Sequence, residues 1–385
     1  MRTPWSVCSG KIDGVRSTID ATDNYLILIE HQRLPTCGAR AVLPFALAGA
    51  QYLIVPQLAV DVPGAPAHMN GGDSDTGAPI FRWQHGRLVE DGLLRLSGGE
   101  DAEFFTLGEE SYLVTAGVRS GHGPYRYNND QVLYKWTSGS WTPIQTFAAF
   151  AAKQWHFFRI GRRAFLALAQ GVTLDHIEAT NPRTSRIYEW NGQQFDDFQT
   201  LEGRWGYNWD SFEIAGQSFL AYADHVGESV LLAWNGSSFA PVQSFSKKAG
   251  RCFRYFTVDG EHYVAFANIQ GDSTLYRWGG KDFSPCQTLG GPGGREFCIV
   301  RTNSNLYLLQ INFIQGEPSA PRTNLMSRVF KWSDGKLVLV EEFPTAGGTD
   351  AAAFSADGKL FVAVSNSLTD DVRFRTDTII YRFNG

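Results

Sequence analysis

The sequence predicts an all-β fold, a single seven-bladed β-propeller with four antiparallel strands in each blade. Three short motifs each occur seven times, they recur together about every 50 residues, and tight-turn residues separate them. Propeller blades are built from such units of four short strands. The clearest motif is an aromatic or leucine residue two positions before Trp or Phe. Its copies end at Trp83, Trp136, Trp190, Trp234, Trp278, Trp332 and Phe383.

Residues 185–224 show the order of strands in the repeat. The first strand of a unit holds a Phe-x-apolar motif, as in residues 212–214, and the second begins with aromatic-Leu-x-x-Ala or a looser copy, as at 219. The third strand ends at the aromatic-x-Trp motif of residues 188–190, and the fourth is the run 195–201. Asn-Gly or another glycine separates the third and fourth strands, and Asn-Gly between apolar runs is the strongest hairpin signal because both residues tolerate positive φ.

The two ends of the chain are expected to share the last blade. The last unit stops after its third strand, whereas residues 24–36 resemble a fourth strand without the first three. Gln32 falls where the fourth strands of other units carry Gln145, Gln199, Gln243 and Gln287. The N-terminal strand therefore closes the ring and removes an exposed sheet edge. Residues 1–23 are expected to form an N-terminal arm, and residues 24–385 the propeller domain.

The pattern of residues 187–200, Ile-Tyr-x-Trp-Asn-Gly-x-x-Phe-x-x-x-Gln-Thr, followed by the Phe-x-Ile and Phe-Leu-Ala strands, resembles the EAR repeat, also called EPTP. The resemblance covers roughly residues 24–383 in seven copies. It implies a seven-bladed propeller that serves as a ligand-recognition module for cell-surface proteins rather than as an enzyme. It also implies that calcium can be held near the axis.

Composition and charge narrow the function classes. The net charge is −5, and no basic run or aromatic-interleaved Lys/Arg stripe occurs, so nucleic acid is not an expected partner. No apolar stretch is long enough to span a membrane. The first residues carry no apolar export signal, which favours a cytoplasmic location and leaves an extracellular one open.

Loop length indicates which face carries function. If each first strand runs from one face to the other, the second-to-third loops and the connections between blades lie on the face where it starts. Turns on the opposite face are short and rich in glycine. The long second-to-third loops are predicted at 58–79, 118–131, 171–186, 313–327 and 367–377, and the short ones at 225–229 and 269–273. Recognition usually resides on long loops of a rigid scaffold, so we expect a protein, glycan or small molecule to bind this long-loop face.

Polar residues near the starts of the first strands are expected to meet around the mouth of the central channel, where three interpretations compete. In the structural one, these side chains satisfy one another and trapped water. In the second, Asp101, Glu296 and Asp350 hold a hard cation such as Ca²⁺. The third is a catalytic pocket in which His156 acts with Asp210 or Glu103 as acid and base and Arg254 clamps an anion. The ligand contacts expected around this funnel are Trp155, Arg204, Trp205, Tyr207, Trp209 and Arg295.

The sequence supports two functions of different classes. We predict a recognition propeller that binds a protein or glycan partner through the long-loop face. The alternative is an enzyme of small-molecule metabolism with its active site in the polar funnel. The missing export signal and the clustered His, Asp, Glu and Arg favour the enzyme. The resemblance, and the absence of G-x-S-x-G, H-E-x-x-H and phosphate-loop motifs, favour recognition. Whether any reaction is catalysed is left open, and no cofactor other than calcium is indicated.

Overall fold

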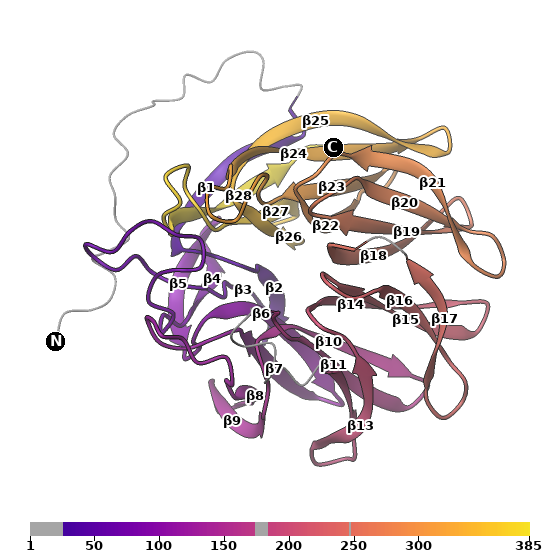
Figure 1. Cartoon of the computed structure of the whole chain (residues 1–385), viewed down its shortest axis with the longest axis horizontal. Coiled ribbons are helices and arrows are strands. Elements are labelled where there is room, and N and C mark those ends of the chain that lie inside the picture. The colour runs from indigo at the N-terminus through magenta and orange to yellow at the C-terminus, as the bar shows by residue number, and fades with distance from the viewer. Residues whose placement is uncertain (1–25, 174–183, 246–247) are drawn as a thin grey trace.

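The computed structural model describes residues 26–173, 184–245 and 248–385. Within these residues, 28 strands form seven four-stranded antiparallel sheets around a central axis, and there is no helix that could span a membrane (Figure 1). The seven-bladed propeller predicted from the repeat is therefore confirmed. Its blades are numbered here from the first complete one.

Each blade contributes four strands, from the channel to the rim. Blade 1 comprises β2 (Leu43–Leu47), β3 (Ala50–Ile54), β4 (Ala78–Gln84) and β5 (Arg87–Leu94), and blade 2 comprises β6 (Gly99–Leu107), β7 (Glu110–Gly117), β8 (Gln131–Thr137) and β9 (Ser140–Phe147). Blade 3 comprises β10 (Ala152–Ile160), β11 (Arg163–Gln170), β12 (Thr184–Trp190) and β13 (Phe195–Glu202), and blade 4 comprises β14 (Gly206–Ile214), β15 (Gln217–Asp224), β16 (Ser229–Trp234) and β17 (Phe239–Phe245). Blade 5 comprises β18 (Gly250–Val258), β19 (Glu261–Asn268), β20 (Ser273–Trp278) and β21 (Phe283–Gly290), and blade 6 comprises β22 (Gly294–Arg301), β23 (Leu306–Asn312), β24 (Asn324–Ser333) and β25 (Lys336–Ala346).

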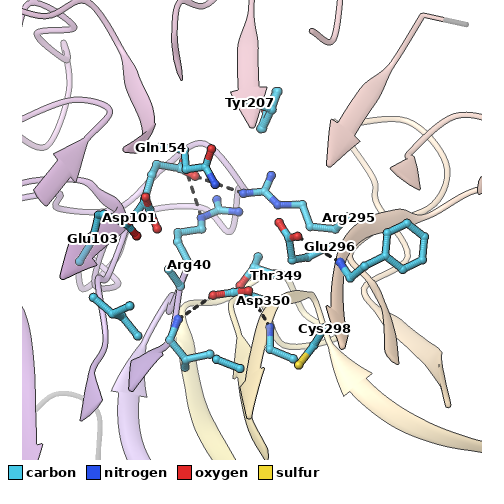
Figure 2. A pocket seen from close by; sticks show the side chains of 18 of the residues that line it. Arg40, Asp101, Glu103, Gln154, Tyr207, Arg295, Glu296, Cys298, Thr349 and Asp350 are labelled. Atoms are coloured by element: carbon cyan, nitrogen blue, oxygen red, sulfur yellow. Dashed lines mark hydrogen bonds and ion pairs between the residues drawn. The ribbon is translucent and has the colours of Figure 1, made fainter. Parts of the chain in front are cut away.

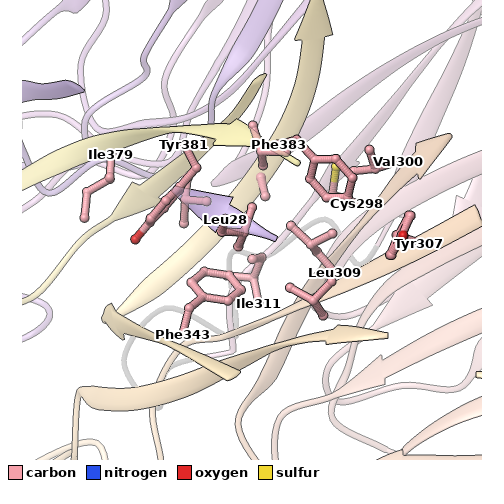
Figure 3. Close-up of a cluster of buried hydrophobic side chains, with 14 residues drawn as sticks. Leu28, Cys298, Val300, Tyr307, Leu309, Ile311, Phe343, Ile379, Tyr381 and Phe383 are labelled. Carbon is pink, nitrogen blue, oxygen red and sulfur yellow. The ribbon is translucent and has the colours of Figure 1, made fainter. Parts of the chain in front are cut away.

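Blade 7 joins the two ends of the chain. It comprises β26 (Gly348–Ala356), β27 (Lys359–Asn366), β28 (Arg375–Phe383) and β1 (Leu28–Cys37). Strand β1 pairs antiparallel with β28, with Leu28 opposite Phe383 and Cys37 opposite Arg375. Leu28 also packs into a hydrophobic cluster shared with blade 6 (Figure 3). The predicted closing strand is thus confirmed, while the predicted N-terminal arm, 1–23, lies outside the described residues.

Aromatic side chains fill the wedges between blades. Phe105 of blade 2 stacks on Phe157 of blade 3 with ring centroids 4.3 Å apart and planes 5° apart. Phe212 of blade 4 stacks in the same way on Tyr255 of blade 5, at 4.2 Å and 7°. Because each sheet is covered on both faces, the repeat needs large flat side chains on both, and this explains its aromatic content.

Glutamine side chains join the outer strands of neighbouring blades. The Gln199 side chain lies 2.8 Å (Nε2) from the Phe239 carbonyl oxygen and 2.9 Å (Oε1) from the Phe239 amide nitrogen, and so donates one hydrogen bond and accepts another. The same two-way clamp is made by Gln32, Gln145, Gln243 and Gln287. Two of the seven seams, the contacts between outer strands of neighbouring blades, have no glutamine. In one, Glu341 accepts hydrogen bonds from the Ile27 and Leu28 amides, and in the other the equivalent residue is Gly92, which has no side chain. The glutamine that recurs in the sequence is an inter-blade clamp.

Candidate functional site

A β-bulge lies at the second residue of the innermost strand in six of the seven blades. In each, the pairing register skips one residue near the start of the strand, as between Gly99 and Asp101. A bulge can re-aim a side chain, and the skipped residues all line one cavity of about 370 Å³ on the propeller axis. Together with Arg40, which precedes β2, they form the cationic ring: Arg40, Glu100, Lys153, Tyr207, Arg251, Arg295 and Thr349.

Glu100 lies inside the cationic ring among three basic side chains. Its carboxylate is 3.2 Å from Lys153 Nζ, 3.3 Å from Arg295 Nη2 and 3.9 Å from Arg40 Nε. Figure 2 shows Arg40 and Arg295 converging from opposite sides of the channel. Burial alone would raise the pKa of Glu100, but the charges of Lys153, Arg40 and Arg295 outweigh it and lower this pKa to about 2.

Arg251 is the basic residue of the ring that forms no ion pair with any described residue. Its guanidinium lies over the Tyr207 ring, with Cζ 3.9 Å from the centroid. The residue is 8% exposed, and its Nε and Nη1 have no hydrogen-bond partner. Burial lowers the pKa of Arg251 to about 10. This end of the ring therefore holds buried donors that no residue in the described part of the chain satisfies.

A second layer, the amide-binding belt, lies on the same strands one and three residues beyond the ring. It comprises Asp101, Glu103, Gln154, Asn208, Asp210 and Asp350. Each of these six side chains accepts a hydrogen bond of 2.5–2.9 Å from a backbone amide of the next blade. The Asp210 carboxylate, for example, accepts from the Tyr255 amide at 2.6 Å. The belt fastens the innermost strands to one another.

The predicted catalytic residues all make such contacts between blades. Glu103 and Asp210 belong to the amide-binding belt, and Arg254 binds Glu296 at 3.1 Å and the Phe297 carbonyl at 3.2 Å. His156 Nε2 lies 2.8 Å from Ser211 Oγ, and burial with the nearby Arg254 charge lowers its pKa to about 3. Among the described residues, no carboxylate bonds the other ring nitrogen of His156, so this pair lacks the third member of a catalytic triad.

The predicted calcium ligands do not fit a calcium site. Glu296 is engaged by Arg254 and by the Cys252 thiol, while Asp101 and Asp350 each accept a backbone amide of the next blade. Burial and Glu103 raise the pKa of Asp101 well above its usual range, and burial and Glu296 raise that of Asp350 to about 7. Calcium needs several converging ionised oxygens. No group of three His, Cys, Asp or Glu in the described part of the chain could hold a metal ion.

The structure divides the predicted ligand contacts. Trp155 and Trp209 are 1% and 0% exposed and lie in the hydrophobic core between blades. They are core residues, so the prediction that they contact a ligand is wrong. Tyr207 and Arg295 line the channel as members of the cationic ring. Trp205 stacks on Tyr207 with centroids 6.2 Å apart, and the Arg204 amide donates to the Asp224 carboxylate at 2.8 Å.

Sequence reasoning missed most of the cationic ring. The candidates named from the sequence, such as Asp101 and Glu103, lie six and four residues before the end of the Phe-x-apolar motif, and these are belt positions. The position seven residues before the end of the motif is basic in four of the seven copies: Arg40, Lys153, Arg251 and Arg295. That recurrence was the available signal, but only the bulge shows that this position faces the channel.

The second-to-third loops and the inter-blade connections lie together on one face, as predicted. Their backbones are hydrogen bonded: the Leu58 amide donates to Gly38, His225 to Trp205 and Phe313 to Gly293, at 2.8–2.9 Å. The residues that begin these loops form an apolar collar over the cationic ring. Its members include Leu58, Val118, Val172, Ile269, Phe313 and Leu368.

Long loops of three consecutive blades are braced into one platform. Arg119 of blade 2 donates to the Asn70 and Gly71 carbonyls of the blade 1 loop, both at 2.6 Å, and stacks 3.7 Å above the Tyr125 ring. From blade 7, Arg373 donates to the Ala65 carbonyl at 3.0 Å. The platform, residues 55–77, 118–130 and 367–374, is therefore held in one arrangement by side-chain contacts. Of the predicted blade 3 loop, residues 174–183 lie outside the described ones.

A groove of about 670 Å³ lies between blades 6 and 7 beside this face. Leu325, Met326, Pro344 and Ile379 contribute apolar surface, and Arg33 and Arg375 contribute charge. Met326 is 44% exposed, so its side chain is accessible from solvent along this groove.

Comparison with known proteins agrees with this architecture. The EPTP domain model matches residues 194–235, 238–278 and 336–384. The human thrombospondin-type laminin G domain and EAR repeat-containing protein is 28% identical over 213 residues, which cover 54% of this chain and 29% of that protein. The chain belongs to the EAR/EPTP family. The mouse protein of the same name is 27% identical over 169 residues, covering 42% of this EAR/EPTP propeller and 24% of the relative. The match thus spans less than a third of either relative.

Proposed function

We propose that this EAR/EPTP propeller is a recognition module that binds a protein partner through its long-loop face. The observation that carries the proposal is the braced platform of residues 55–77, 118–130 and 367–374. Loops held by side-chain hydrogen bonds lose little conformational entropy on binding, so a partner meets a preformed surface. The apolar groove between blades 6 and 7 lies beside that surface and offers a place for an apolar anchor of the partner.

The membership of the EAR/EPTP family supports recognition over catalysis. The residues expected to carry catalysis are instead engaged in contacts between blades. A platform made of loops from several blades offers the breadth of a protein interface, which commonly buries about 800 Å² on each partner. A glycan partner is the outcome that the experiment below must separate from this proposal.

The test is cross-linking of the purified chain to proteins it captures from extracts, followed by mass spectrometry of the linked sites. We expect the links to fall on the platform and on residues 313–323. The Met326→Asp variant, which places a charge in the groove, should reduce capture about tenfold, as loss of one interface anchor does. Val242→Asp is the matched control, because Val242 is 54% exposed on the outer strand of blade 4.

Links confined to the short-turn face or to the outer strands would contradict the proposal. Capture that is abolished by enzymatic removal of glycans from the extract would assign a glycan as the ligand instead of a protein.

A further inference from the structure

The cationic ring carries more positive charge than its own residues neutralise. Four basic side chains surround a single carboxylate, Glu100, and Arg40, Lys153 and Arg295 all lie within 4 Å of it. The Glu296 carboxylate, which also lines this cavity, is paired with Arg254 at 3.1 Å. Buried charges are normally paired, because an unpaired ion loses its hydration without compensation. The ring is therefore incomplete as a purely structural feature.

Arg251 marks where an anion would bind. It is more than nine-tenths buried, it lines the channel cavity, and its Nε and Nη1 have no partner within residues 26–173, 184–245 and 248–385. The Nε of Arg40, equally buried on the same cavity, also lacks a hydrogen bond. Water could satisfy these donors but would leave the charge uncompensated, whereas an anion does both.

The surroundings favour a compact anion with more than one negative charge. The planar fork of a guanidinium matches phosphate and carboxylate oxygens, and an excess of three positive charges is better balanced by a dianion than by a monoanion. The cavity of about 370 Å³ holds a phosphate with room for a small substituent.

We propose that the cationic ring is a binding site for a phosphate group, held by Arg251, Arg295 and Arg40 beside the Tyr207 ring. The site takes inorganic phosphate or the phosphate of a small phosphomonoester. It is independent of the protein partner proposed for the long-loop face.

Equilibrium dialysis of the full chain against radiolabelled inorganic phosphate, at an ionic strength held constant with sodium chloride, tests the site. We expect saturable binding of one phosphate per chain. Arg251→Gln should weaken it about tenfold or more, since it removes a charge-assisted contact. Arg277→Gln is the matched control, because Arg277 lies in the same blade but is exposed and paired with Glu261 at 3.1 Å. This control should bind as the wild type does.

Competition by glycerol 2-phosphate distinguishes the two sources of the group. Tighter binding than phosphate indicates an organic monoester, and weaker binding indicates the free ion. If Arg251→Gln does not fold, Lys153→Gln removes another cation of the ring and should also weaken binding. The proposal is overturned if phosphate does not saturate the chain at millimolar concentration, if both ring variants bind normally, or if malonate binds and phosphate does not.

Discussion

The amide-binding belt lies on four of the six innermost strands that carry the cationic ring, and the charged groups of the two layers are satisfied in opposite ways. The Asp210 carboxylate of the belt accepts a hydrogen bond from the Tyr255 amide at 2.6 Å, whereas Arg251 of the ring has two donors without a partner among the described residues. Both residues are less than a tenth exposed. Burial therefore does not distinguish a structural polar residue from one available to a ligand. Whether the side chain's hydrogen bonds are satisfied within the fold does distinguish them.

Removing a belt carboxylate should destabilise the propeller most. Asp210→Ala leaves the buried Tyr255 amide without its acceptor, and we expect the free energy of unfolding to fall by about 2 to 4 kcal/mol. Urea denaturation of both proteins measures the loss. Asp210→Asn keeps an acceptor oxygen and should lose much less. Equal stability of Asp210→Ala and the wild type would mean that the belt does not hold the blades together.

The belt should also make stability depend on pH. The pKa of Asp350 is raised to about 7 by burial and Glu296, and it returns to about 4 in the unfolded chain. Between these values the folded state keeps a proton that the unfolded chain releases, so this residue's contribution falls by up to about 1.4 kcal/mol per unit as pH rises.

Asp350→Asn removes this titration and keeps an acceptor for the Val42 amide. We compare the free energy of unfolding of the variant with that of the wild type at each pH. The difference between them should shift in favour of the variant by about 1 to 3 kcal/mol between pH 4 and pH 8. Urea denaturation of the two proteins across this range measures the gain. Parallel pH profiles would show that Asp350 keeps an ordinary pKa in the fold.

Removing the Arg251 charge from the ring should stabilise the fold, whereas removing a belt carboxylate should destabilise it. In buffer without phosphate, Arg251→Gln eliminates a buried guanidinium that has no ion pair, at the cost of its contact with the Tyr207 ring. We expect thermal or urea unfolding to show a net gain of about 1 kcal/mol. A loss larger than about 2 kcal/mol would place Arg251 with the belt residues as a structural group.

The smallest effect is expected at the one outer seam without a side-chain clamp. Gly92 pairs with Ile80 as Gln199 pairs with Ile187, and a Cβ added there would meet nothing within 4 Å. Gly92→Gln should therefore clamp the Trp141 backbone and raise the free energy of unfolding by about 0.5 to 1 kcal/mol. Gly92→Ala is the control for the glycine effect alone. If the two variants are equally stable, the glutamine clamps do not contribute to the other seams.

Much of the fold followed from periodicity. Copies of the aromatic-x-Trp motif ending at Trp83 through Phe383 predicted seven blades, and the missing fourth strand of the last unit predicted the partnership of β1 with β28. Gln32 aligned in the sequence with the glutamines of the other fourth strands, although only the structure shows that these residues clamp neighbouring blades. These inferences succeeded because strand alternation and turn chemistry act over a few residues, which a sequence displays directly.

The site followed from the sequence only in outline. Trp155 and Trp209 are predicted from the sequence as ligand contacts around the funnel, yet both fill the wedge between blades. Arg251 was overlooked because a one-residue bulge turns it into the channel, and a regular strand would place the neighbouring Cys252 there instead. A change of one residue in register reverses which face of a strand a side chain occupies.

The sequence by itself determined the number of blades, the order of strands and the face on which the long loops gather, because each depends on patterns local to one repeat. Only the tertiary structure decided which polar residues of the channel are satisfied. Their partners are backbone amides of the next blade, such as Tyr255 for Asp210, and charges from across the ring, such as Arg295 for Glu100, 195 residues away. Those distances are closed by the circular arrangement of the blades, and no local pattern encodes them.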